Sequence, residues 1–273
     1  MTSKELRQSL RSGDPLFGTL IVSPSPRWPA MVAGCGLDFV FIDTEHIALD
    51  RSQLSWMCQT YSAMGLPPLV RIPSPDPYQA CMALDGGAAG VIAPYVESVD
   101  EVLALRGAIK LRPLKGERLA AMLDDSTSVE PGVRHYWQKH NTDKLFIINI
   151  ESKPALERLD ELLAVPDLDA VLIGPHDLSC SLGIPEAYDD PRFIEACSTI
   201  FQKARRAGLG AGIHFWGNLE QQSRWFELGA NLLIHSADIT LFEKHLKLEL
   251  SEIKQAVGLV GEPLSQLAIE TVV

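Results

Sequence analysis

Short apolar runs alternate along the chain with longer segments of helical periodicity, and this alternation constrains the fold more than any other feature. Runs that indicate strands cover residues 16–22, 38–43, 67–72, 90–95, 145–151, 169–173, 210–215 and 231–235. Helical patterns cover residues 27–34, 50–63, 76–84, 99–108, 154–164, 190–207, 218–228 and 240–256. Eight alternating pairs indicate parallel strands joined by right-handed crossovers. We therefore predict a single (β/α)8 TIM barrel over residues 1–257 and a C-terminal tail over 258–273.

Charged residues stand where several of these apolar runs end. Asp43-Thr44-Glu45-His46 follows the second run, Arg71 closes the third and Glu151 closes the fifth. Asp177 comes shortly after the sixth run. Charges at these positions do not help a core, but in a parallel barrel the carboxyl ends of the strands converge on the face that carries the chemistry. The sequence therefore predicts an active site at this end of the barrel.

Composition and charge exclude several classes of function. The formal net charge of −11 argues against nucleic acid, which requires clustered basic side chains, and the positive charges are dispersed or confined to residues 110–118. No apolar run approaches the roughly 20 residues of a membrane helix, and the N-terminus lacks a signal-peptide pattern. We expect a cytoplasmic protein. The five cysteines contain no C-x-x-C and indicate reduced packing residues.

Glu151 and Asp177 are the best candidates for metal ligands. Two carboxylates with open coordination positions suit a divalent cation such as Mg²⁺, which keeps waters and binds substrate directly. The alternative is that Glu151 forms a structural salt bridge with Arg71 or Lys153. His46 is the natural general base because imidazole titrates near neutral pH. Arg71 offers a fixed cation for an oxyanion or a substrate carboxylate, and it also balances the neighbouring acids.

Two other chemistries are disfavoured. The segments after the seventh and eighth strands, 214–218 and 235–238, lack the glycine-rich cradle of a phosphate site. Lys144 and Lys153 flank their strand and do not lie inside the barrel, which disfavours imine catalysis. His214 and His235 are better explained as hydrogen-bonded core residues. The polar segment 111–143 is either an active-site cover or a simple surface insertion.

Several motifs together resemble one known family, the metal-dependent HpcH/HpaI aldolases, also described as class II pyruvate aldolases. The resemblance extends from about Phe17 to Leu250 and is carried by segments 36–46, 70–73, 84–88, 150–152 and 173–179. It implies a βα barrel that assembles as a hexamer or trimer of dimers with the last helix exchanged between partners. It also implies reversible aldol cleavage of a 4-hydroxy-2-oxo acid with a divalent metal (Mg²⁺, Mn²⁺ or Co²⁺).

The resemblance also implies roles for single residues. Glu151 and Asp177 would bind the metal, His46 would be the base and Arg71 would stabilise the enolate. The backbone from Gly174 through Pro175 and His176 to Asp177 would receive the pyruvate carboxylate. Asp85 would raise the basicity of His46.

Asp85 precedes a strand and so belongs to the other end of the barrel from His46. Either the local geometry bends back or Asp85 acts on a site in an adjoining subunit. Asp43 is the nearer candidate to orient His46 within one chain.

Three departures from the family pattern affect the expected substrate contacts. Asn149 replaces the frequent Gln two residues before the metal Glu, and His176 replaces the common Ala before the metal Asp. Arg118 of the family loop motif is retained in segment 112–119, but the glycine that follows it is not. These changes leave the metal residues intact and alter the substrate side of the site.

The hypothesis from sequence is therefore a divalent-metal aldolase that cleaves a 4-hydroxy-2-oxo acid to pyruvate, or a related 2-oxo acid, and an aldehyde. One alternative is a β-hydroxyacyl-CoA lyase of the malyl- or citramalyl-CoA type, which predicts a basic nucleotide-binding surface. A second is a barrel that binds an oxo acid without turnover. A metal-dependent hydrolase is a third, weakened by the lack of a metal-binding histidine cluster.

Overall fold

The computed structural model describes residues 1–124 and 129–259 and forms a closed barrel of eight parallel strands. Each strand pairs with its neighbours in chain order, and β8 closes the barrel against β1. The predicted TIM barrel is thus confirmed. The strands are β1 (Leu16–Leu20), β2 (Phe39–Asp43), β3 (Pro68–Arg71), β4 (Gly90–Ala93), β5 (Leu145–Asn149), β6 (Ala170–Ile173), β7 (Gly210–Phe215) and β8 (Leu232–Ala237).

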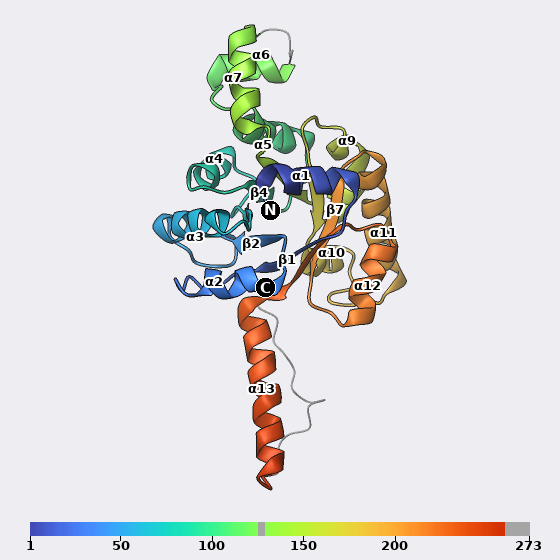
Figure 1. Ribbon diagram of the computed structural model, residues 1–273. Coiled ribbons are helices and arrows are strands. Elements are labelled where there is room, and N and C mark those ends of the chain that lie inside the picture. The colour runs from blue at the N-terminus through green and yellow to red at the C-terminus, as the bar shows by residue number, and fades with distance from the viewer. Residues whose placement is uncertain (125–128, 260–273) are drawn as a thin grey trace.

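Helices surround the barrel between successive strands (Figure 1). Those in the predicted segments are α2 (Trp28–Val32) with the 3₁₀ turn η1 (Ala33–Cys35), α3 (Arg51–Ala63), α4 (Pro77–Asp85), α5 (Val99–Lys110), α8 (Lys153–Glu157), α9 (Leu159–Leu163), α11 (Pro191–Arg206), α12 (Leu219–Glu227) and α13 (Asp238–Ala256). Four further helices were absent from the predicted segments: α1 (Ser3–Ser12), α6 (Gly116–Asp124), α7 (Pro131–Asn141) and α10 (Pro175–Ser181).

Alternate strand residues fill the barrel interior, as the period of two requires. The inner layer includes Phe39 and Phe41 of β2 and Leu145 and Ile147 of β5. Helix α1 closes the amino end of the barrel, because its Leu6 and Leu10 are fully buried in the same cluster. The loops that follow the strands lie at the opposite, carboxyl end of the barrel.

The polar segment 111–143, expected to be an active-site cover or a surface insertion, contains two helices. It contains α6 and α7, with residues 125–128 outside the described part. Because α6 and α7 stand between α5 and β5, they lie toward the amino ends of the strands, whereas α13 leaves from the carboxyl end of β8 and projects to the other side (Figure 1). Helices α6 and α7 therefore lie at the end of the barrel opposite the predicted active site of their own chain.

Helix α13 leaves the barrel at Asp238. Both carboxylate oxygens of Asp238 accept backbone N–H groups from the residues after β1, from Val22 and Ser23 at 3.0 Å each. Asp238 thereby connects the N-terminus of α13 to the end of β1. The predicted tail begins at Gly258, and its residues 260–273 lie outside the described part. In the residues that are described, every helix is too short or too polar to cross a bilayer.

Candidate active site at the carboxyl end of the barrel

The carboxyl ends of β2 and β3 hold an ion pair between Asp43 and Arg71, which stand opposite each other in register. Arg71 Nε and Nη2 donate to the two carboxylate oxygens of Asp43 at 2.8 and 2.7 Å, and both residues are buried. Burial acts to raise the pKa of Asp43, but hydrogen bonds and charge from Arg71 outweigh it and leave the pKa below its usual value. Arg71 is therefore a guanidinium of fixed orientation at the barrel mouth.

The loop after β2 is fixed by the same carboxylate. Asp43 Oδ1 accepts the backbone N–H of Glu45 at 2.9 Å, and Oδ2 accepts that of His46 at 3.3 Å. Glu45 Oε2 lies 3.2 Å from Arg71 Nε and 3.7 Å from His46 Nε2. Within one chain, Asp43 thus positions His46 through the backbone, and Glu45 is the carboxylate beside the imidazole. The His46 side chain is 36% exposed and therefore accessible to a ligand.

Glu151 is a buried carboxylate just beyond the end of β5. Its Oε1 accepts the backbone N–H of Tyr95 at 2.5 Å, and its Oε2 accepts Asn149 Nδ2 at 2.8 Å. Gly174 leaves room for this side chain, because a Cβ at that position would overlap Glu151 Oε2. Three strand ends, those of β4, β5 and β6, therefore define the position of one carboxylate.

The charge of Glu151 is poorly compensated. Burial raises its pKa to about 7; the Tyr95 N–H and Arg71 lower it, and Asp177 and Glu45 raise it again. Asp177 stands in the first turn of α10 and is half-buried. The charge of Asp177 contributes to the raised pKa of Glu151, and a cation bound by both acids would remove this repulsion.

The donor set fits a divalent cation bound by few protein ligands. Asn149 Oδ1 is buried and has no hydrogen-bond partner among the described residues, so a further oxygen beside Glu151 is unsatisfied. Within residues 1–124 and 129–259, no group of three or more His, Cys, Asp or Glu is arranged to hold a metal. Two hard carboxylates suit Mg²⁺ or Mn²⁺, which retain waters, better than zinc, which requires a complete protein cage or three protein ligands.

The segment from Gly174 to Asp177 forms the start of α10 directly after β6. Pro175 occupies the first position of this short helix, where its missing N–H costs no hydrogen bond. His176 turns toward the helix and the following loop, with Nδ1 3.5 Å from Glu186 Oε1 and Nε2 3.8 Å from Cys180 Sγ. The predicted carboxylate-binding segment and Asp177 thus belong to one compact turn.

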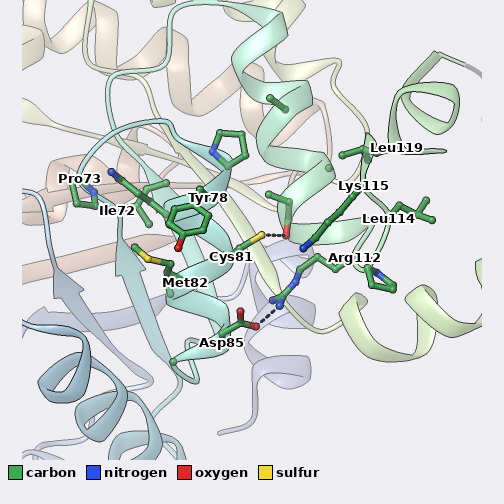
Figure 2. Close-up of a pocket in the computed structure, with 18 of the residues that line it drawn as sticks. Ile72, Pro73, Tyr78, Cys81, Met82, Asp85, Arg112, Leu114, Lys115 and Leu119 are labelled. Carbon is green, nitrogen blue, oxygen red and sulfur yellow. Dashed lines mark hydrogen bonds and ion pairs between the residues drawn. The ribbon is translucent and has the colours of Figure 1, made fainter. Parts of the chain in front are cut away.

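Two predicted site residues lie elsewhere in the chain. Asp85 ends α4, which leads to the amino end of β4, and it pairs with Arg112 (Figure 2). Arg118 lies on α6 and pairs with Glu130. The structure therefore does not bring Asp85 or Arg118 to His46 of the same chain, and the alternative that the local geometry bends Asp85 back is wrong.

The histidines that end the last two strands are both hydrogen-bonded. His214 is buried between Phe41 and Trp216, and its Nε2 contacts the Ser236 carbonyl at 3.2 Å. Burial lowers the pKa of His214 to about 4, so its imidazole is neutral at physiological pH. His235 contacts Gln222 Oε1 at 3.0 Å.

Sequence reasoning missed Tyr95, whose backbone has the positive φ of 47° and presents its N–H to Glu151. Such a conformation is uncommon for a tyrosine and is typical of functional sites. The available signal was its position: Pro94-Tyr95 directly follows β4, as the other site residues follow their strands.

Comparisons with known proteins assign the chain to a family. The sequence model of the family described as HpcH/HpaI aldolase/citrate lyase matches residues 19–243. A hydroxypyruvate/pyruvate aldolase of Paraburkholderia phytofirmans is 28% identical over 259 residues, which cover 91% of this chain and 97% of that protein. A 2-keto-3-deoxy-L-rhamnonate aldolase of Salmonella gallinarum is 28% identical, with 93% and 94% covered.

A solved structure gives the same result at the level of the fold. The crystal structure of an HpcH/HpaI aldolase from Desulfitobacterium hafniense has a TM-score of 0.79 and 27% identity, and it covers 94% of this chain and 99% of its own. The family match spans most of the barrel, including every strand end that carries a site residue. The chain is a carbon–carbon lyase that belongs to the HpcH/HpaI aldolase/citrate lyase family.

Proposed function

We propose that the chain is a divalent-metal-dependent aldolase that reversibly cleaves a 4-hydroxy-2-oxo acid to pyruvate, or a related 2-oxo acid, and an aldehyde. The observation that carries the proposal is the buried carboxylate of Glu151, which the Tyr95 N–H and the Asn149 amide fix at the end of the barrel where Arg71 pairs with Asp43. Glu151 and Asp177 would hold the cation, which supplies Lewis acidity and a template when bound. Mg²⁺ and Mn²⁺ suit carboxylate ligands, and Co²⁺ is the third candidate.

Substrate binding follows from the residues around this pair. The backbone from Gly174 to Asp177 would receive the carboxylate of the oxo acid at the start of α10. Asn149, whose amide donates to Glu151, would lie beside the bound oxo acid. Arg71 would point its guanidinium at the 2-oxo oxygen, where negative charge develops as the bond breaks.

The proton path depends on His46. In cleavage, its imidazole would take the proton of the 4-hydroxyl group, and the electrons of the carbon–carbon bond would pass into the pyruvate enolate as the aldehyde leaves. The imidazolium would then return the proton to C3 of the enolate and give pyruvate. Glu45, 3.7 Å from His46 Nε2, would stabilise the protonated ring between these steps.

The direct test is condensation in the synthetic direction. Purified protein is incubated with pyruvate and a panel of short aldehydes, with Mg²⁺, Mn²⁺ or Co²⁺ in parallel and after dialysis against chelator. We expect 4-hydroxy-2-oxo acids to form only when metal is present, and re-addition of metal to restore the rate. Full activity in the dialysed protein would contradict the metal requirement, and no product with any aldehyde would contradict the activity.

We also propose that the protein is a homo-oligomer, a hexamer or trimer of dimers, in which α13 is exchanged between subunits. Helix α13 extends away from the barrel (Figure 1) and exposes apolar side chains at helical spacing, among them Phe242 at 61% and Ile253 at 58%. An exposed apolar stripe on a projecting helix is typical of a protein–protein interface. A groove of about 1100 Å³ between α4, α5 and α6, lined mainly by apolar residues, offers a surface for a neighbour (Figure 2).

Asp85 is one of the residues that line this groove, and it would act on the His46 of an adjoining subunit. If so, Asp85→Ala and His46→Ala should each be inactive, while co-expression of the two should restore activity. In a random mixture about a quarter of shared sites regain both residues. Recovery toward that level, measured as pyruvate release, supports a site shared between subunits. No recovery, or full activity of Asp85→Ala alone, would show that Asp85 has no role in catalysis beyond its ion pair with Arg112.

A further inference from the structure

A cavity of about 350 Å³ lies at the carboxyl end of the barrel, between the ends of β7 and β8 and the start of α13. Its lining combines one aromatic ring with several neutral polar groups. The ring is that of Trp216, and the polar groups are the hydroxyls of Tyr188, Ser236 and Thr240 and the imidazole of His235. No step of the proposed aldol cleavage uses any of these groups.

The imidazole of His235 presents an unused acceptor. Gln222 Nε2 donates to the Gly217 carbonyl at 2.7 Å, so Gln222 Oε1 is the atom that lies 3.0 Å from His235 Nδ1. Because a carbonyl oxygen only accepts, Nδ1 carries the proton. Burial and the charge of Lys244 lower the pKa of His235, so the ring is neutral at neutral pH. Its Nε2 is then an acceptor, and no described residue donates to it.

The three hydroxyl groups are unused as well. Within the described residues, the side-chain hydroxyls of Tyr188, Ser236 and Thr240 form no hydrogen bond. Burial and the nearby charge of Glu186 raise the pKa of Tyr188 to about 12, so its phenol stays protonated and can donate. The backbone of Ser236 has a positive φ of 54°, which is uncommon for a residue with a side chain and is typical of functional sites.

The cavity adjoins both halves of the proposed catalytic centre. The Trp216 ring meets His214 edge to face, with the ring centroids 5.1 Å apart. After burial, the charge of Arg71 is the next cause of the low pKa of His214, so Arg71 lies near that ring. On the other side, the charge of Asp177 contributes to the raised pKa of Tyr188. A substrate whose oxo-acid end lies at Arg71 and Asp177 would extend its other end toward this cavity.

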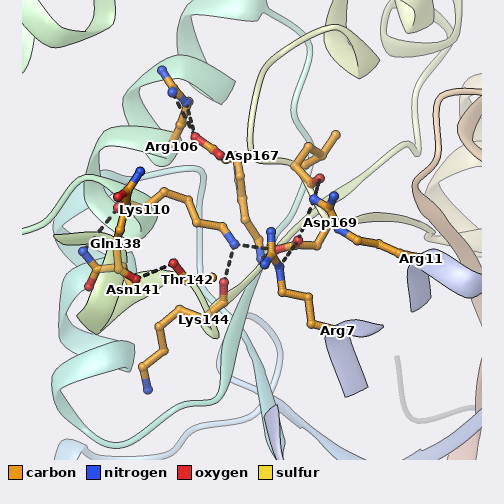
Figure 3. Close-up of polar contacts among 12 residues, drawn as sticks. Arg7, Arg11, Arg106, Lys110, Gln138, Asn141, Thr142, Lys144, Asp167 and Asp169 are labelled. Carbon is orange, nitrogen blue, oxygen red and sulfur yellow. Dashed lines mark hydrogen bonds and ion pairs between the residues drawn. The ribbon is translucent and has the colours of Figure 1, made fainter. Parts of the chain in front are cut away.

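The charges of the lining favour a neutral ligand over an ionic one. Glu186 and Lys244 are both exposed, and their opposite formal charges cancel. The basic residues at the amino end of the barrel are remote and already paired, since Arg7 Nε and Lys110 Nζ each lie 2.6 Å from a carboxylate oxygen of Asp169 (Figure 3). An anionic tail would therefore find no excess of positive charge in the cavity.

From these contacts we infer that the cavity is the subsite for the tail of the aldehyde half, and that this aldehyde is a short polyhydroxylated chain such as glyceraldehyde or erythrose. The inference rests on the proposed aldolase function and adds the chemical class of its second substrate. His235 Nε2 would accept a hydroxyl of the tail, and the Tyr188 phenol would donate to another. The C–H groups of the tail would pack on the Trp216 ring, whose face carries partial negative charge.

The experiment compares aldehydes in the synthetic direction with pyruvate and Mn²⁺ on the full chain. Erythrose is the hydroxylated aldehyde and butanal is the apolar control. Tyr188→Phe removes one hydroxyl and keeps the ring that packs against Phe193 and Phe215. His235→Asn keeps a donor near the position of Nδ1 and removes Nε2. In each variant we expect kcat/KM for erythrose to fall about three- to tenfold, the effect of one lost hydrogen bond, and kcat/KM for butanal to change less than about twofold.

The matched control is Tyr136→Phe, which removes an exposed hydroxyl from α7 at the other end of the barrel and should keep the parent ratio of the two aldehydes. An unchanged ratio in both cavity variants would overturn the subsite, and so would equal losses with both aldehydes, which indicate a structural role. Preference for succinic semialdehyde over erythrose, lost in Lys244→Gln, would overturn the neutral tail. A parent that condenses no aldehyde would instead contradict the aldolase function on which the subsite rests.

Discussion

Replacement of Glu151 by Gln should abolish aldolase activity and weaken binding of Mn²⁺ by about two orders of magnitude or more. The change keeps the shape of the side chain and its contact to the Tyr95 N–H but removes the charge that would hold a cation. Asp177 alone then offers one half-buried carboxylate. Metal affinity is measured by calorimetry and activity by pyruvate release. An exposed acid, Glu161→Gln on α9, is the matched control and should behave as the parent.

The same variant tests the environment of Glu151 without metal. Its folded pKa of about 7 exceeds the ordinary 4.5, so the folded state retains a proton that the unfolded chain has lost. Stability from this group is therefore complete below about pH 4.5 and is lost as the pH rises to about 7. Between about pH 6 and pH 8 the metal-free parent should lose about 1 kcal/mol of unfolding free energy from this group, and Glu151→Gln should not. Equal pH dependence in both proteins would refute the raised pKa.

Replacement of His46 by Ala should lower the rate of pyruvate release on the order of 1000-fold, because a positioned general base contributes about two to four orders of magnitude. Metal affinity should change little, since Glu151 and Asp177 remain. The exchange of pyruvate methyl protons with deuterium, followed by NMR, should slow as well, because the same imidazole would exchange the proton at C3.

His140→Ala, on α7 at the other end of the barrel, removes an exposed imidazole and should leave both rates unchanged. If the His46→Ala variant turned over substrate at the parent rate, the general base would have to be another group. Normal exchange combined with lost cleavage would limit His46 to the hydroxyl proton.

The order of strands and helices was predictable because each element buries one face against the same core. β5, for example, is almost continuously apolar and buried along its length. Helix α1 was not among the predicted helical segments, since only Leu6 and Leu10 of its ten residues are buried and the rest is polar. Helix α10 is seven residues long and begins at a proline, so it offers too little periodicity to detect.

The candidate site was predictable as far as side chains at strand ends are concerned. Asp43, Arg71 and Glu151 lie at the same end of the barrel because parallel strands end at one face. The Tyr95 N–H that fixes Glu151 has no signature in sequence, because every residue but proline carries the same donor. The charge cluster of Asp169 was equally hidden, since its partners Arg7 and Lys110 are 162 and 59 residues away.

The absence of a side chain at Gly174 has a consequence for laboratory evolution of substrate range. Any larger residue there would push Glu151 out of its place, so position 174 should stay fixed in a mutant library. Two residues further along the same turn, the His176 side chain is 39% exposed, and its Nδ1 lies 3.5 Å from Oε1 of the exposed Glu186. The turn at the start of α10 therefore combines one position that should not tolerate substitution with a nearby position that can be varied to change the substrate range.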